Sequence, residues 1–379
     1  MQYRRLGERV SEQVSALGFG CMRLPMAEHD GERSIDIPQA VEMFETALDA
    51  GINYFDTAYP YHGGESEKVV GEHLCRTRRD EFLLATKMPI WKVEKESDFD
   101  EIFAEQLEKL QTDYIDFYLV HAIDLPRWTN AKELGIQSWM KKKQESGAIR
   151  YKGFSFHGLS TDFPKIIDDW ADEWDFCQIQ YNYIDIDHQA GRKGLRYAAS
   201  RGIGVVIMEP LQGGSLATPP PSVVKALGDK RGADPVGSAL CWLWDQAEVG
   251  VVLSGMSTPE QLQENLTHAD RSGIGSLDDS GRTIYRNAKK AFDDLRSVKC
   301  TACEYCLPCP NGVAIPGVFR AMNQATAFSY PKAVRNQYGW IPEAHRASAC
   351  IECGECMDKC PQKIDIITEL KRADEFLTA

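Results

Sequence analysis

Long apolar runs are missing from this chain of 379 residues. No uninterrupted apolar stretch approaches the length that crosses a bilayer, so we expect no membrane partner. The first residues, Met1-Gln2-Tyr3-Arg4-Arg5, lack the apolar segment of a signal peptide. Both absences predict a cytoplasmic chain.

Positive charge is also in short supply. Lys and Arg number 43 against 56 for Asp and Glu, which gives a net charge of −13 at pH 7. Such a chain repels a phosphate backbone unless a basic patch is segregated, so we expect no nucleic-acid partner. The deficit belongs to residues 1–294, because residues 295–379 carry 10 basic and 9 acidic residues.

Cysteine is scarce in residues 1–294 and dense in the rest. The four scattered cysteines, which we interpret as buried apolar residues, are Cys21, Cys75, Cys177 and Cys241. The other eight of the 12 fall between Cys300 and Cys360. Because a large body without a secretory signal precedes this cluster, metal ligation is favoured over disulfides. We predict two domains, residues 1–294 and 295–379, joined by a polar helix over residues 282–296.

Short apolar, β-prone runs alternate with segments of helical period in the first domain. The eight expected strands are residues 16–24, 53–58, 82–88, 114–122, 151–156, 176–183, 204–209 and 250–254. The expected helices are residues 38–50, 65–74, 99–110, 135–145, 189–199, 236–245 and 259–269. This alternation predicts an α/β fold, a (β/α)8 TIM barrel of parallel strands. An open doubly wound sheet is the alternative, but its Gly-x-Gly-x-x-Gly turn is missing after the first strand.

Three ionisable residues end three consecutive expected strands: Asp56, Lys87 and His121. Taken singly, each is consistent with a structural ion pair or a core histidine. Because the carboxyl ends of barrel strands meet at one face, we expect the three to form a catalytic site together. Tyr61 follows Asp56 by five residues, in the loop after the second strand.

These four residue types fit one reaction. A phenol ionises near pH 10 and is a weak acid, but an adjacent ammonium lowers its pKa. We expect Lys87 to supply that charge to Tyr61 and Asp56 to hold the ammonium. His121 would donate a hydrogen bond to a carbonyl oxygen as negative charge develops on it. Such a site needs a hydride source across the pocket.

The sequence here resembles the aldo-keto reductases. Residues 51–61, GINYFDTAYPY, followed by Gly64-Glu65-Ser66-Glu67, are similar to the family's signature around its aspartate and tyrosine. Thr86-Lys87 and Leu119-Val120-His121 match its lysine and histidine segments, and the resemblance covers about residues 1–270. It implies a TIM barrel, a small carbonyl substrate, NAD(P)H, and the catalytic tetrad Asp56, Tyr61, Lys87 and His121.

The same resemblance implies residues that bind an extended nicotinamide dinucleotide. Ser155 and Gln180 would contact the carboxamide, and Tyr181 would stack on the nicotinamide ring. The loop of Gly213 and Gly214 would let backbone amides approach the pyrophosphate.

At the adenine end, the resemblance implies contacts from Glu264 and Asn265. Many family members that prefer NADPH have a basic pair around the 2′-phosphate. This chain has Gly255 and Gln261 there, so the choice between NAD and NADP stays open.

The second domain carries two runs of regularly spaced cysteines. They read Cys300-x2-Cys303-x2-Cys306-x2-Cys309-Pro310 and Cys350-x2-Cys353-x2-Cys356-x3-Cys360-Pro361. The second is the bacterial ferredoxin pattern, in which the fourth cysteine serves the other cluster, and the first is one residue shorter. We therefore predict one [4Fe–4S] cluster on Cys300, Cys303, Cys306 and Cys360. A second would be held by Cys350, Cys353, Cys356 and Cys309.

Two alternatives to this ligand set remain. Two four-thiolate zinc sites also satisfy the cysteine count, although zinc sites usually lack the trailing Cys-Pro. If Cys309 does not reach the second site, that cluster is a three-iron form or absent. Helical patterns over residues 318–325 and 333–337 predict a small α-helical ferredoxin-like domain.

The two halves together leave three hypotheses, because nicotinamide passes two electrons as hydride and each cluster passes one. The favoured one is a carbonyl reductase whose clusters are structural, redox-sensing or an electron port to an electron-transfer protein. The others are an iron–sulfur flavoenzyme and a redox-responsive binding subunit without turnover. Specificity would come from loops at residues 90–97, 124–134 and 217–237, with Trp91 and Trp128 as candidate pocket walls.

Overall fold

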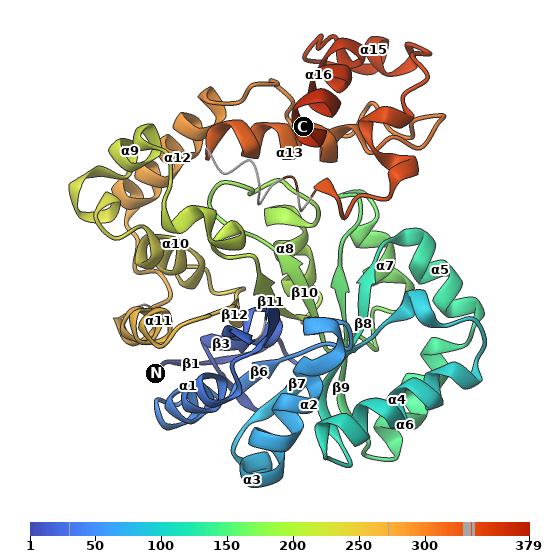
Figure 1. Cartoon of the computed structure of the whole chain (residues 1–379), viewed down its shortest axis with the longest axis vertical. Coiled ribbons are helices and arrows are strands. Elements are labelled where there is room, and N and C mark those ends of the chain that lie inside the picture. Colours follow the sequence, from blue (N-terminus) through green and yellow to red (C-terminus); the bar gives the residue numbers. More distant parts are fainter. Residues whose placement is uncertain (30, 272, 329–334, 336–337) are drawn as a thin grey trace. The chain divides into compact units, whose positions relative to one another are not determined.

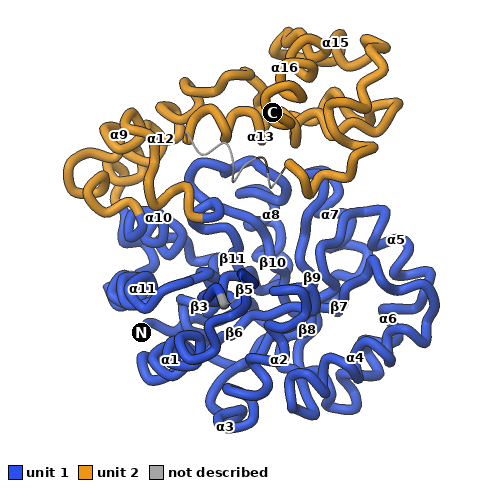
Figure 2. Tube along the Cα trace, viewed as in Figure 1, with its two compact units in different colours: residues 1–213, 236–277 blue, residues 214–235, 278–379 orange. Residues whose placement is uncertain are grey.

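The computed structural model describes all residues except 30, 272, 329–334 and 336–337. The chain forms two compact units, shown in Figure 2: residues 1–213 with 236–277, and residues 214–235 with 278–379. Residues 278–294 thus belong to the second unit in this division. The domain boundary expected at residue 295 stays a prediction. Within the described ranges, no helix is long and apolar enough to span a membrane.

The first unit is built on a closed barrel of eight parallel strands (Figure 1). In barrel order they are β3 (Leu17–Gly20), β6 (Tyr54–Asp56), β7 (Leu83–Met88), β8 (Ile115–Ile123), β9 (Ile149–Phe156), β10 (Phe176–Gln180), β11 (Gly204–Met208) and β12 (Val251–Ser254). β12 pairs with β3 through Val252 and Leu17, which closes the barrel. The expected TIM barrel is confirmed, and the open sheet is not.

Large side chains fill the barrel interior. The ring of Phe117 lies 5.0 Å from the rings of Tyr54 and Phe176, centroid to centroid. An N-terminal hairpin, β1 (Tyr3–Arg5) and β2 (Gln13–Ser15), precedes the barrel, and Leu6 and Val14 pack into the same core cluster. With the interior filled, polar chemistry is confined to the strand ends.

Helices alternate with the strands and surround them in Figure 1. They are α1 (Ile37–Asp49), α2 (Glu65–Val70), α3 (Arg76–Arg78), α4 (Ser97–Leu110), α5 (Leu125–Glu133), α6 (Ile136–Glu145), α7 (Phe163–Asp169), α8 (Gly191–Ser200), α10 (Pro235–Trp244) and α11 (Pro259–Arg271). A second hairpin, β4 (Met26–His29) and β5 (Glu32–Ile35), lies outside the barrel sheet. Residues 124–134, expected as a loop, form α5, because Asp124 caps it by accepting a hydrogen bond from the Arg127 amide.

The second unit is helical and cysteine-rich. Its helices are α9 (Pro221–Gly232), α12 (Asp279–Asp294), α13 (Ile315–Ala327), α15 (Glu355–Lys359) and α16 (Ile366–Thr378). Its apolar core includes Phe319 of α13 and Leu370 of α16, together with Cys356 and Cys360. The helix expected over residues 318–325 lies inside α13, whereas the one expected over residues 333–337 falls mostly outside the described residues.

Candidate functional site

The centre of the barrel site is a buried ion pair. Asp56 ends β6, and Lys87 lies in β7, the neighbouring strand. The Nζ atom of Lys87 is 2.7 Å from Oδ1 of Asp56 and donates a second hydrogen bond, also of 2.7 Å, to the carbonyl oxygen of Thr57. Only 2% of Asp56 and none of Lys87 is exposed. Two partners therefore fix the position of the ammonium.

Tyr61 reaches this ion pair from a short turn after β6, Tyr61–Gly64. Its hydroxyl lies 3.4 Å from Nζ of Lys87. Three residues in a row, His62, Gly63 and Gly64, have positive φ in this turn. Glycine adopts that conformation without strain, which lets the chain fold back sharply after the tyrosine.

His121, in β8, completes the set. Its ring centroid is 6.2 Å from that of Tyr61, in an edge-to-face arrangement, and 5.0 Å from that of Trp91. The structure thus brings the four residues predicted for catalysis to one end of adjacent strands.

Burial and charge set the protonation of this group. Burial lowers the pKa of Lys87, but Asp56 and Tyr61 together outweigh this effect, and the net pKa is raised. Burial also raises the pKa of Tyr61, and the opposing effect of Lys87 is smaller, so the expected lowering of this pKa is wrong. The pKa of His121 is well below its ordinary value because of burial and nearby positive charge. Lys87 is therefore charged at neutral pH, while Tyr61 and His121 are uncharged.

The residues expected around a carboxamide lie on the adjoining strands. Ser155 of β9 accepts a 2.7 Å hydrogen bond from the amide of Ala122, which leaves its hydroxyl proton free to donate. Gln180 ends β10, and its Oε1 atom is buried without a hydrogen-bond partner in the described structure. The same holds for Oε1 of Gln178. Buried acceptors of this kind fit the amide group of a ligand.

The side chain of Tyr181, expected to stack on a nicotinamide ring, is buried among other side chains. Its side chain is fully buried, its hydroxyl is 3.1 Å from Oε1 of Gln246, and its ring centroid is 4.9 Å from that of Trp242. Stacking of this ring on a nicotinamide stays a prediction.

The remaining residues expected to contact a dinucleotide lie in a glycine turn and in α11. Gly213 and Gly214 both have positive φ. Asn265 of α11 is buried and donates a 2.8 Å hydrogen bond to Oγ of Ser254, at the carboxyl end of β12, whereas its neighbour Glu264 is exposed. Their contacts with a dinucleotide remain predictions.

The absence of a side chain at Gly255 leaves room for the side chain of Arg23. A Cβ atom at this position would lie 2.9 Å from Cδ of Arg23. Oγ of Ser257 donates a 2.9 Å hydrogen bond to the carbonyl oxygen of Arg23. The exposed Arg23 side chain therefore packs against Gly255, at the place where the sequence lacks the basic pair.

The two tryptophans considered as pocket walls differ. Trp91 is 47% exposed and lies beside His121, as a pocket wall should. Trp128 is fully buried, donates a 2.7 Å hydrogen bond to Asp169 and packs on Trp174. Trp128 is a core residue of α5, and its expected pocket role is wrong.

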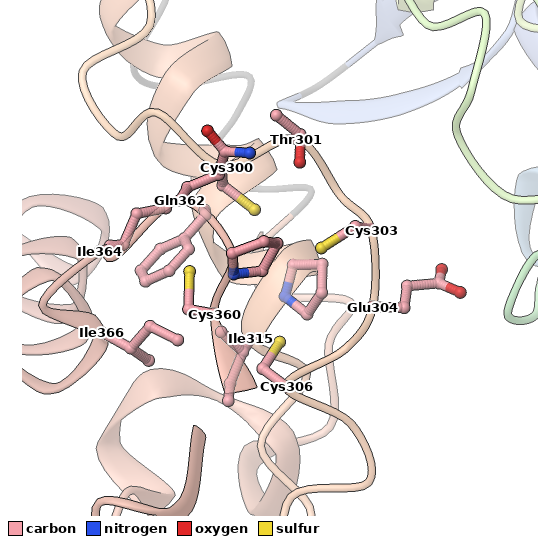
Figure 3. Close-up of a pocket in the computed structure, with 13 residues that line it drawn as sticks. Cys300, Thr301, Cys303, Glu304, Cys306, Ile315, Cys360, Gln362, Ile364 and Ile366 are labelled. Atoms are coloured by element: carbon pink, nitrogen blue, oxygen red, sulfur yellow. The ribbon is translucent and has the colours of Figure 1, made fainter. Parts of the chain in front are cut away.

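Four cysteines of the second unit line one cavity. They are Cys300, Cys303, Cys306 and Cys360. The space around this cavity measures about 330 Å³, part of it open to solvent, and Figure 3 shows the four sulfur atoms directed to the same space. Apolar side chains such as Ile364 and Ile366 form much of the remaining wall.

The other four cysteines line a second cavity of nearly the same size, about 320 Å³. They are Cys309, Cys350, Cys353 and Cys356. Cys309 therefore lies with the second run although the first run is one residue short. Ile315, at the start of α13, lines both cavities. Two sets of four thiols around two similar cavities fit two similar metal clusters.

Two residues near Lys87 were missed by the sequence analysis. Glu67 and Gln106 are fully buried and hydrogen-bonded to each other. The sequence marks Glu67 only by its place in the Gly-Glu-Ser-Glu motif after the tyrosine, and it does not mark Gln106.

Comparison with known proteins agrees with this architecture. The sequence profile of the Aldo/keto reductase family matches residues 16–272, and that of the 4Fe-4S dicluster domain matches residues 299–364.

The L-galactose dehydrogenase of Arabidopsis thaliana is 30% identical over 292 residues, which cover 70% of this chain and 87% of that protein. The NADH-specific methylglyoxal reductase of Escherichia coli is 24% identical over 329 residues, which cover 74% and 96%. An aldo-keto reductase of Bacillus halodurans, solved in its holo form, superimposes with a TM-score of 0.64 at 25% identity, over 77% of this chain and 97% of that one. The chain thus belongs to the aldo/keto reductase family and is an oxidoreductase with a C-terminal 4Fe-4S dicluster domain.

Proposed function

We propose that the barrel reduces an aldehyde or ketone to an alcohol with NAD(P)H. The observation that carries this proposal is the ammonium of Lys87, 2.7 Å from Asp56 and 3.4 Å from the hydroxyl of Tyr61. A fixed, buried cation beside a phenol helps the phenol to give a proton to a carbonyl oxygen on which negative charge develops. The dihydronicotinamide, when bound, supplies the hydride to the carbonyl carbon.

Each member of the tetrad has one task in this scheme. Tyr61 keeps its proton until reaction, because burial raises its pKa, and then donates it to the substrate oxygen. The ammonium of Lys87 stabilises the phenolate that this transfer leaves behind. Asp56 holds the ammonium in place, and the uncharged His121 donates one N–H to the same oxygen.

The family resemblance supports the proposed cofactor residues, and for Gln180 the barrel geometry adds support. We assign Ser155 and Gln180 to the carboxamide, since Gln180 Oε1 is a buried acceptor without a hydrogen-bond partner in the described chain. The remaining assignments are Tyr181 to the nicotinamide ring, Gly213 and Gly214 to the pyrophosphate, and Glu264 and Asn265 to the adenine. The similarity to an NADH-specific methylglyoxal reductase supports a nicotinamide cofactor and a small carbonyl substrate.

The cysteine-rich unit would hold two [4Fe–4S] clusters. The first would be bound by Cys300, Cys303, Cys306 and Cys360, and the second by Cys309, Cys350, Cys353 and Cys356. One cysteine of each set, Cys303 and Cys353, is exposed, which supports exchange of single electrons with a protein partner. Carbonyl reduction itself needs no such exchange, because hydride carries both electrons.

Replacing the proton donor tests the barrel proposal. Tyr61→Phe removes only the hydroxyl, so we expect kcat for a small aldehyde to fall by about 10³-fold or more. The dissociation constant for NAD(P)H, measured by fluorescence titration, should change by less than about twofold. Retained turnover in this variant contradicts the assignment of Tyr61.

The content of the anaerobically purified protein tests the cofactors. We expect iron and sulfide in the amounts of two cubane clusters, no stoichiometric zinc, and no bound flavin. Zinc without iron would overturn the cluster assignment. A bound flavin would overturn the nicotinamide assignment and favour an iron–sulfur flavoenzyme.

A further inference from the structure

A second buried carboxylate lies close to Lys87. Glu67 of α2 has no exposed surface. Its Oε1 atom accepts a 2.6 Å hydrogen bond from Oγ1 of Thr86 and a 2.7 Å hydrogen bond from Nε2 of Gln106. Among the described residues it forms no ion pair, and both donors are neutral. A carboxyl group is costly in such surroundings, so its presence there calls for a reason beyond filling space.

The donors to Glu67 connect it to the backbone of Lys87. Thr86 precedes Lys87 in β7, and Nε2 of Gln106 also donates a 3.1 Å hydrogen bond to the carbonyl oxygen of Lys87. The hydroxyl of Tyr118 donates a 2.6 Å hydrogen bond to Oε1 of Gln106. Because the carbonyl oxygen of Lys87 can only accept a hydrogen bond, the amide nitrogen of Gln106 must face Lys87 and Glu67, and its amide oxygen is left to accept from Tyr118.

The residue next to Glu67 reaches the other end of Lys87. Oγ of Ser66 is 2.9 Å from Oγ1 of Thr57, and the carbonyl oxygen of Thr57 accepts a hydrogen bond from the Lys87 ammonium. The start of α2 therefore holds the peptide of Lys87 through Glu67 and its ammonium through Ser66. All of these side chains are buried, so water cannot replace the contacts.

We infer that Glu67 is a positioning residue for Lys87: through Thr86 and Gln106 it fixes the peptide that carries the ammonium beside Tyr61. This inference rests on the proposed function of Lys87 and Tyr61. Loss of Glu67 leaves two buried donors without their acceptor and frees the end of β7 to shift. Small displacements of reacting groups reduce rates by up to about 10²-fold.

Two substitutions of Glu67 separate this role from general stability. Glu67→Leu removes both acceptor contacts, and we expect kcat to fall by about 10-fold to 100-fold with the KM for NAD(P)H unchanged. Glu67→Gln keeps the shape and an acceptor oxygen, so it should restore kcat to within about threefold of the wild type. If the leucine variant does not fold, Thr86→Val, which removes one of the two bonds, gives a smaller loss of kcat in the same direction.

The pH dependence of kcat adds a readout that a purely structural role would not move. The Lys87 ammonium lowers the pKa of Tyr61 against the effect of burial. An ammonium displaced from Tyr61 gives up part of that lowering. The alkaline fall of kcat should therefore move to higher pH in Glu67→Leu and stay in place in Glu67→Gln.

Asp116 provides the matched control. It is also buried, and its Oδ2 atom accepts a 2.8 Å hydrogen bond from the amide of Leu84, in the same strand but toward its other end. Asp116→Asn should lower the melting temperature at least as much as Glu67→Gln does and leave kcat and its pH dependence unchanged.

The outcomes distinguish this inference from the proposed function. Loss of kcat in Lys87→Met together with an unchanged kcat and alkaline limb in Glu67→Leu and Thr86→Val overturns the positioning role alone. An equal loss of kcat in Glu67→Leu and Asp116→Asn overturns it as well, because the effect is then one of stability. Full activity of Lys87→Met overturns the proposed function instead.

Discussion

The barrel site and the cysteine-rich unit are assembled in different ways. In the barrel, Lys87 contacts both Asp56 and Tyr61 directly, so these side chains are held by one another. In the second unit, eight thiols face two cavities, and none of them forms a disulfide in the described ranges of the chain. The first arrangement is held by its own contacts, as the proposed catalysis requires. We expect the second to need a bound group that holds its thiols together.

Removal of the barrel's central cation gives the largest expected effect. Lys87→Met leaves the carboxylate of Asp56 buried without its cation and Tyr61 without a counter-charge. We expect kcat for a small aldehyde to fall by about 10³-fold or more, while iron content and the electron paramagnetic resonance signal of the clusters stay unchanged. A loss of iron in this variant would mean that the barrel site and the cysteine-rich unit are not assembled independently.

Removal of iron tests the opposite half of the comparison. A strong chelator under reducing conditions should make residues 299–364 sensitive to protease, because Cys356 and Cys360 belong to the core of their unit and lose the group that joins them to the other thiols. The affinity of the barrel for NAD(P)H should change by less than about twofold. Protease resistance of the iron-free unit would show that packing of α13 on α16 is sufficient to hold the thiols.

Single ligand substitutions sharpen the account of the two cavities. Cys309→Ser and Cys360→Ser each remove one thiol from a different cavity, so each should reduce the iron content from about eight to about four atoms per chain. Cys177→Ala, in β10, removes a buried thiol of the barrel and serves as the control with unchanged iron. Loss of all the iron in Cys309→Ser would mean that one cluster does not form without the other.

Arg23 is a residue of the barrel that we expect to contact a bound cofactor. Its exposed side chain packs against Gly255, and within the described chain its guanidinium has no ion-pair partner. If it meets the 2′-phosphate of NADPH, Arg23→Ala should raise the KM for NADPH about tenfold and leave the KM for NADH unchanged. Arg5→Ala, which removes another exposed guanidinium, should change neither value. Equal KM changes for the two cofactors would exclude a phosphate contact.

In both regions, the features that are local in the sequence could be predicted from it. The barrel strands, with Asp56, Lys87 and His121 at or near their carboxyl ends, could be predicted from the sequence. Buried strands are short apolar runs, and an ionisable residue near the end of such a run stands out. The ferredoxin pattern, in which the fourth cysteine of each run serves the other cluster, predicted which four cysteines share a cavity. These are local features of the chain, and a sequence displays them directly.

The features that could not be predicted depend on how deeply a side chain is buried and on residues that are distant in the sequence. The direction of the pKa shift of Tyr61 was wrong, because spacing reveals a nearby ammonium but not how much water is excluded. Trp91 and Trp128 both appeared to lie in loops, yet one is exposed beside His121 and the other is buried in α5. Glu67 and Gln106 escaped notice, because polar residues in a helix usually mark its solvent face.

The smallest expected effect concerns pH. Because the pKa of Lys87 is raised, it keeps its proton through the neutral range, and burial keeps the proton on Tyr61 by raising its pKa as well. His121 stays uncharged, since burial, followed by the charges of Lys87, His157 and Arg127, holds its pKa well below the ordinary value. Lys87, Tyr61 and His121 therefore keep these protonation states through the neutral range, and kcat/KM for an uncharged aldehyde should vary less than about twofold between about pH 6 and pH 9. An acid limb near pH 6.5 that disappears in His121→Phe would mean that His121 accepts a proton in this range. The protonation of the barrel site would then depend on the pH of the solution and not on its own buried charges. Control by its own buried charges is the property that distinguishes this site from the cysteine-rich unit.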